Sequence, residues 1–141
     1  MPAISRVLIR TSVVYLAAAA LLGILTAVPA AAADMLPAGL EPAQLHLLVV
    51  GWITQLIFGV ALWMFPRYGD RGAVSIGRAA WIAYAALNAG LLLRLAGEPW
   101  LAARTDSVGA RVVLAASAVS QWGAVMYFAL RLWKRTAAGR G

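Results

Sequence analysis

The sequence predicts an all-α membrane protein: a bundle of four transmembrane helices with both termini in the cytoplasm. Three observations support this prediction. Of the 141 residues, 63% are hydrophobic and only 12% are charged, whereas soluble domains are about half apolar. The mean hydropathy is +0.82. The charged residues also divide the chain into four long uncharged runs.

Each uncharged run predicts one helix, because a helix needs about 20 residues to cross the hydrocarbon core. We expect a single membrane domain over 1–141, with spans near 8–33, 42–66, 78–97 and 110–133. The third span reaches this length only if it continues past Arg94 to Gly97. Arg94 then lies about one turn inside the helix end, from which its guanidinium can snorkel to the interface.

Lysine and arginine residues fix the expected orientation. Nine of the twelve lie on one side of the predicted bundle: Arg6, Arg10, Arg67, Arg71, Arg78, Arg131, Lys134, Arg135 and Arg140. The positive-inside rule places that side in the cytoplasm. We therefore expect a multi-pass protein of the bacterial inner (plasma) membrane. Its net charge of +7 is explained by topology and contact with anionic membrane lipid, without nucleic acid.

The first span has a second interpretation. Arg6 and Arg10, an apolar stretch and three alanines before Asp34 also fit a signal peptide with a small-residue cleavage site. The uncharged run from Thr11 to Ala33 is longer than the usual core of about 7 to 15 residues, so we expect the helix to be retained. Cleavage would leave three helices in the same orientation.

Three amide side chains lie near the centres of their runs: Gln55, Asn88 and Gln121. An unpaired amide in hydrocarbon costs several kcal/mol, so we expect these groups to face one another or a partner chain. Their simplest role is to hold helices together. No Asp or Glu lies inside any span, which argues against a proton-coupled transporter.

The second span carries a row of small and polar residues, Gly51, Gln55 and Gly59, which is suited to close helix packing. On a wheel of 100° per residue His46 lies opposite Gln55. The same outward face carries Val49, Val50, Ile53 and Ile57. The wheel therefore predicts that His46 faces lipid or another subunit.

His46 is the only histidine, and there is no cysteine, so disulfides and thiolate metal sites are excluded. Pro42 suits the first turn of its helix, which places His46 roughly 6 Å below the outer surface. The ring either bonds to a headgroup or loop, or ligates heme iron. Arg94 and Arg111, predicted at the same depth, could bind heme propionates or snorkel. Trp52 could wall the macrocycle or belong to the core.

Two segments carry a family resemblance: Leu45–Trp52, which reads LHLLVVGW, and Phe58–Arg67, which reads FGVALWMFPR. They resemble helix two of the catalytic subunit of heme-copper oxidases and nitric oxide reductases, and in particular its short four-helix, subunit I-like relatives. The resemblance implies a heme b whose low-spin iron is ligated by His46. It covers Ser5 to Arg71, just under half of the chain.

The chain departs from that family in having no further histidines for the catalytic metals. We therefore expect no complete oxidase or reductase, and enzyme activity stays open. One histidine allows an open iron face, a second ligand such as Met35, or two His46 rings from a homo-oligomer, either trimer or dimer. The expected function is electron transfer or diatomic gas binding, with a possible respiratory-chain partner. The alternative is an accessory or assembly subunit without its own heme.

Overall fold

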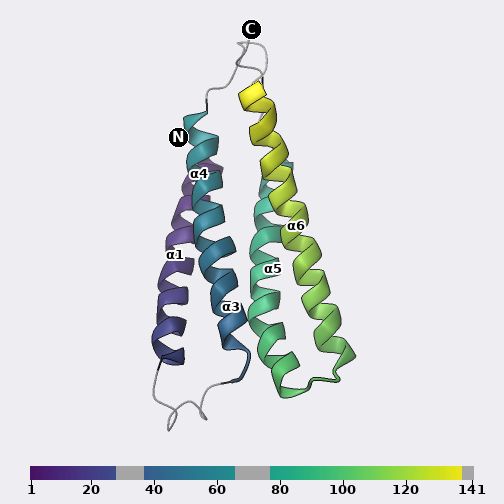
Figure 1. Ribbon diagram of the computed structural model, residues 1–141. Coiled ribbons are helices and arrows are strands. Elements are labelled where there is room, and N and C mark those ends of the chain that lie inside the picture. The colour runs from purple at the N-terminus through teal and green to yellow at the C-terminus, as the bar shows by residue number, and fades with distance from the viewer. Residues whose placement is uncertain (28–36, 66–76, 138–141) are drawn as a thin grey trace.

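A computed structural model describes residues 1–27, 37–65 and 77–137 (Figure 1). In these ranges all regular secondary structure is helical, without a strand, which confirms the predicted all-α class. Four helices are long and apolar enough to cross a membrane. They are α1 (Ala3–Thr26), a second helix composed of α3 (Leu40–His46), η1 (Leu47–Thr54) and α4 (Gln55–Met64), then α5 (Arg78–Ala103) and α6 (Val108–Ala137).

The helix bounds differ from the predicted spans mainly at three ends. The first helix begins at Ala3, and its predicted end at 33 lies outside the described residues. The fourth extends from Val108 to Ala137. The third continues through Pro99 to Ala103 instead of ending at Gly97, because a proline removes only one backbone donor and neighbouring turns can hold the helix.

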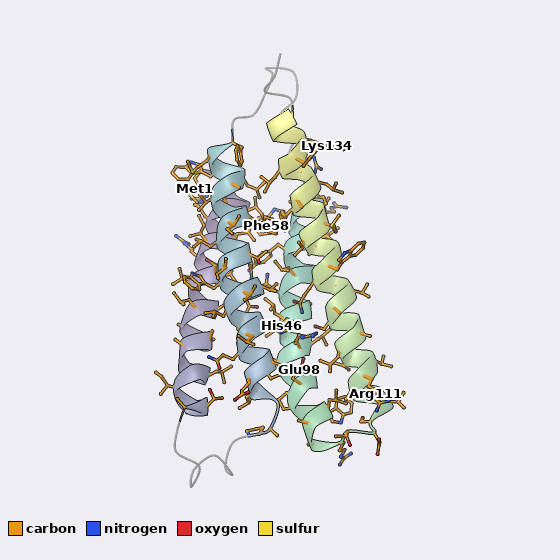
Figure 2. All side chains as sticks on the ribbon, in the orientation of Figure 1. Met1, His46, Phe58, Glu98, Arg111 and Lys134 are labelled. Atoms are coloured by element: carbon orange, nitrogen blue, oxygen red, sulfur yellow. The ribbon has the colours of Figure 1, made fainter. Side chains whose placement is uncertain are left out.

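The four helices lie side by side as two antiparallel pairs (Figure 1). One pair is α1 with η1 and α4, and the other is α5 with α6. Met1 and Lys134 lie at one end of the bundle, whereas Glu98 and Arg111 lie at the opposite end (Figure 2). The positions of Met1 and Lys134 at the same end agree with an even number of membrane crossings. Which end faces the cytoplasm stays a prediction.

Two apolar clusters form the interior. The larger joins α1, α4, α5 and α6, and Phe58 stacks at a tilt on Phe128 with ring centroids 5.1 Å apart. The smaller joins Ala19, Leu47 and Leu91. Large apolar side chains also cover the outside, including Val119 and Trp122, which are 69% and 67% exposed. An apolar exterior of this kind is the expected surface of a protein whose solvent is lipid.

The second helix changes its hydrogen-bonding pattern halfway along. Between Leu47 and Thr54 it is a π-helix of eight residues, although most π-helices are single-turn bulges. Five of the buried residues of the second helix recur at four-residue spacing: Ala43, Leu47, Gly51, Gln55 and Gly59. On an α-helix of 3.6 residues per turn such a row drifts by about 40° per step, or roughly 160° in total.

Wider π-turns remove this drift and keep the whole row on one face. At Gly51 and Gly59 that face lies against α1, where the backbone approaches closely. A Cβ atom at Gly51 would lie 2.7 Å from Cγ of Tyr15, and one at Gly59 would lie 2.8 Å from Cγ1 of Ile9. The π-helix is therefore the backbone geometry that lets a four-residue row serve as a packing seam.

The π-turns also overturn the wheel prediction for Val50. Val49, Ile53 and Ile57 are exposed, as the wheel predicts. Val50, predicted on the same outward face, packs instead against both apolar clusters. His46 lies four residues before Val50, and its ring is only partly exposed. Whether His46 faces lipid or another subunit stays a prediction.

Candidate functional site

His46 is the last residue of α3, at the junction with the π-helix. Pro42 lies in the first turn of α3, as predicted, and its carbonyl oxygen is 2.8 Å from Nδ1 of His46. With the proton on Nδ1, that nitrogen donates to the carbonyl and Nε2 presents a lone pair. In that tautomer the site offers one nitrogen ligand, held in its orientation by the hydrogen bond to its own helix.

Gly39 positions the beginning of α3 against α5. It adopts φ = 84°, which favours glycine, and a Cβ atom here would lie 2.7 Å from the carbonyl oxygen of Glu98. Since the helices are antiparallel, Glu98 is level with the start of α3. Arg94, one turn earlier on α5, lies deeper in the bundle, nearer the level of His46.

Arg94 has a partner within its own helix. Its Nε lies 3.2 Å from Oε1 of Glu98, four residues later, in a mostly buried ion pair. Nε is not aligned for a hydrogen bond with that carboxylate. The guanidinium is therefore neutralised locally, and a propionate at this site would have to share it with Glu98.

Arg111 and Trp52 do not converge on His46 within the chain. Arg111 donates from a terminal nitrogen to the carbonyl oxygen of Thr105, 3.0 Å away, and closes the short connection between α5 and α6. Trp52 follows His46 by six residues, which places it on a different face in either α or π geometry. Of the four predicted binding residues, only His46 presents a ligand atom without another role for it.

The polar side chains at mid-bundle form two separate sets. Nε2 of Gln55 donates to Oδ1 of Asn88 at 3.3 Å, and Nδ2 of Asn88 donates to the carbonyl oxygen of Tyr84 at 2.7 Å. Oε1 of Gln55 is fully buried without a hydrogen-bond partner. The predicted meeting of amides is therefore correct for the helix pair α4 and α5.

Gln121 does not join them, which corrects that prediction in part. Its Nε2 donates to Oγ of Ser117 at 2.9 Å, and Ser117 donates to the carbonyl oxygen of Gly90 at 2.7 Å. The side chain of Gln121 lies over Gly90 on α5. This α6-facing side of α5 is separate from the side that carries Asn88 toward Gln55.

Fold and site alone define the class of this protein. It is a four-helix bundle whose helices are long and apolar enough to cross a membrane, with one imidazole held near an end. No family model, curated protein or solved structure matches this chain. In the described part of the chain, no three His, Cys, Asp or Glu side chains gather into a metal site. A porphyrin brings its own equatorial nitrogens, so an axial site needs only one residue.

Sequence reasoning missed three features near His46. The ion pair of Arg94 with Glu98 has a clear signal in their spacing of four residues, which brings side chains together on a helix. The π-helix also has a signal, because a four-residue row longer than two steps does not fit 3.6 residues per turn. The only sequence signal for Thr54, the last residue of the π-helix, is the four-residue row that indicates the π-helix itself.

Proposed function

We propose that this protein binds heme b, with His46 as an axial ligand of the iron, at an interface between copies of the chain. One observation carries the proposal: Nδ1 of His46 lies 2.8 Å from the carbonyl oxygen of Pro42. Histidines that ligate metals usually donate their other N–H to such an acceptor, which fixes the tautomer and makes the ligating nitrogen more basic. Nε2 is left as the ligating atom.

The interface is proposed because one chain supplies the ligand but not the surroundings. The ring of His46 is partly exposed, whereas Arg94 and Arg111 are engaged elsewhere in the chain. A second or third copy would cover the exposed edge of the macrocycle. Bound heme would supply one-electron transfer or diatomic gas binding, and the residues of this chain would orient it and exclude lipid and water.

The test is an absorption spectrum of the protein purified in detergent, before and after titration with hemin. We expect a Soret band that tracks the protein, and its loss in His46→Ala. Leu45→Ala is the matched control, because Leu45 is the neighbouring exposed residue and offers no ligand; its Soret band should equal that of the parent. A band unchanged in His46→Ala would overturn the proposal.

Heme stoichiometry distinguishes the arrangements. One heme per two chains supports two His46 ligands on one iron, whereas one heme per chain supports a single histidine. Carbon monoxide added to the reduced protein shifts the Soret band only if one iron face is open or carries a displaceable ligand. Met35, the internal candidate for a second ligand, lies outside the described residues, so Met35→Leu tests it directly.

A second candidate is an accessory or assembly subunit of a respiratory membrane complex. The observation that favours it is the neutralisation of Arg94 by Glu98, which provides a stable end to the bundle without any propionate. This function predicts a colourless protein, even after titration with hemin, that copurifies with a fixed partner from its native membrane.

A further inference from the structure

We propose that the π-helix sets the face on which His46 is presented and that Thr54 is the positioning residue that holds it in place. The hydroxyl of Thr54 donates to the carbonyl oxygen of Val49 at 2.8 Å, across five residues. The geometric part of the proposal is independent of heme. Its meaning for iron ligation rests on the proposed function.

The bond across five residues distinguishes Thr54 from a threonine in ordinary helix. In α1 the hydroxyl of Thr26 donates to the carbonyl oxygens of Leu22 and Gly23, four and three residues earlier, which is the usual pattern. A hydroxyl that reaches five residues back matches the repeat of a π-turn. Thr54 thus stabilises the final π-turn specifically, since in an α-turn its hydroxyl would face other carbonyls.

The π-helix and an α-helix of the same sequence place His46 differently. Each π-turn holds nearly one residue more than an α-turn, so each residue advances by a smaller angle around the helix axis. Over eight residues the difference in angle is more than a quarter of a turn. With Gln55 held on Asn88, the α form would turn His46 and Val50 toward lipid. The π form brings Val50 against the apolar clusters and His46 onto the same row.

Packing on both sides supports the π form. Gly51, at its centre, admits the ring base of Tyr15 at a distance that no side chain would allow. Leu47, at its first turn, is buried with Ala19 and Leu91. An α form would turn Ala43 and Gly59, at the two ends of the row, roughly 160° apart, so the choice between forms is coupled to contact with α1. The position of a ligand on His46 therefore depends on the packing of this seam.

The experiment measures rotation directly with spin labels. The chain has no native cysteine, so single cysteines at Val49 and Val50 can carry a nitroxide in bilayers. Collision with oxygen, which concentrates in lipid, reports exposure. In the parent background we expect the label at position 49 to be severalfold more accessible than the label at position 50. Equal accessibility at the two positions would overturn the π geometry.

The role of Thr54 is tested by a matched pair of variants. Thr54→Val keeps the branched shape without the hydroxyl, and we expect the label at position 50 to approach the accessibility of position 49. Thr54→Ser retains the hydroxyl and should preserve the parent difference. If both variants preserve the difference, or both abolish it, Thr54 is not the positioning residue. If Thr54→Val fails to fold, Thr54→Ala provides the hydroxyl-free member of the pair.

A spectroscopic arm connects the geometry to iron. With hemin bound through His46, Thr54→Val should shift the Soret maximum or weaken hemin binding severalfold, whereas Thr54→Ser should match the parent. If the parent protein shows no Soret band, the proposed function is wrong, whereas the spin-label result is unaffected. A normal Soret band in Thr54→Val, together with a rotated label, would show that ligation does not depend on this face and would overturn the link.

Discussion

The two helix pairs of this bundle achieve close approach by different means. In the pair of α5 and α6, the glycines at the seam, Gly90 and Gly97, are seven residues apart. Seven residues are nearly two complete α-turns, so both face α6 without any change in helix geometry. In the other pair, Gly51 and Gly59 belong to a four-residue row that only wider turns keep aligned. The comparison shows that residue spacing, as well as residue size, selects the backbone form at a helix seam.

Hydroxyl groups reinforce the difference. On α6, Ser117 and Ser120 donate to carbonyl oxygens of Gly90 and Ala86 across the seam, both at 2.7 Å. On the second helix, Thr54 donates within its own helix. The seam between α5 and α6 therefore has hydrogen bonds from hydroxyl to backbone between its helices, whereas the other seam has a side-chain bond, from the hydroxyl of Thr26 to Oε1 of Gln44 at 3.4 Å.

The largest expected effect comes from Gly51→Ala. The new methyl group would contact Cβ and Cγ of Tyr15 at 2.9 and 2.7 Å, and these atoms are too close to the backbone to swing away. Overpacking of this kind costs about 1 to 3 kcal/mol, and we expect the upper part of that range. The free energy of unfolding in mixed micelles measures it. Gly123→Ala is the control, because its methyl group meets nothing within 4 Å; a loss equal to that of Gly51→Ala would contradict the seam.

A smaller loss is expected for Gly90→Ala in the other pair. The new methyl group would lie 2.7 Å from Cγ of Gln121, which is flexible, and 3.0 Å from the carbonyl oxygen of Ser117. We expect about 1 to 2 kcal/mol by the same unfolding measurement. Adding Gln121→Ala should recover part of this loss by removing the first contact. No recovery would mean that the backbone contact alone decides the cost.

The smallest effect concerns the amides between the pairs. A double-mutant cycle with Gln55→Leu and Asn88→Leu should give a coupling of about 0.6 kcal/mol, typical of a hydrogen bond between membrane helices. The matched cycle of Gln121→Leu with Asn88→Leu should give a coupling near zero, because Gln121 bonds to Ser117 instead. Equal couplings in both cycles would contradict the division into two polar sets.

The sequence predicted the four helices because hydropathy and length determine them. It predicted the meeting of Gln55 with Asn88 because an unpaired amide in hydrocarbon is costly. It also placed Pro42 in the first turn before His46. The predicted direction of Val50 was wrong because the wheel assumed one angular step for every residue. The partner of Arg94 was missed although Glu98 was four residues away. That His46, Arg94 and Arg111 share a ligand stays a prediction, because within the chain Arg94 contacts Glu98 and Arg111 donates to Thr105.

The connection between α5 and α6 has a consequence for biosynthesis. Arg104 to Ser107 form a closed turn, in which the backbone N–H of Ser107 donates to the carbonyl oxygen of Arg104 and the hydroxyl of Ser107 accepts from the N–H of Ala110. A turn this short keeps the two helices antiparallel as soon as both have formed. We therefore expect α5 and α6 to enter the bilayer together as a helical hairpin, with Arg104 in the turn and Arg111 at the start of α6 at the same end.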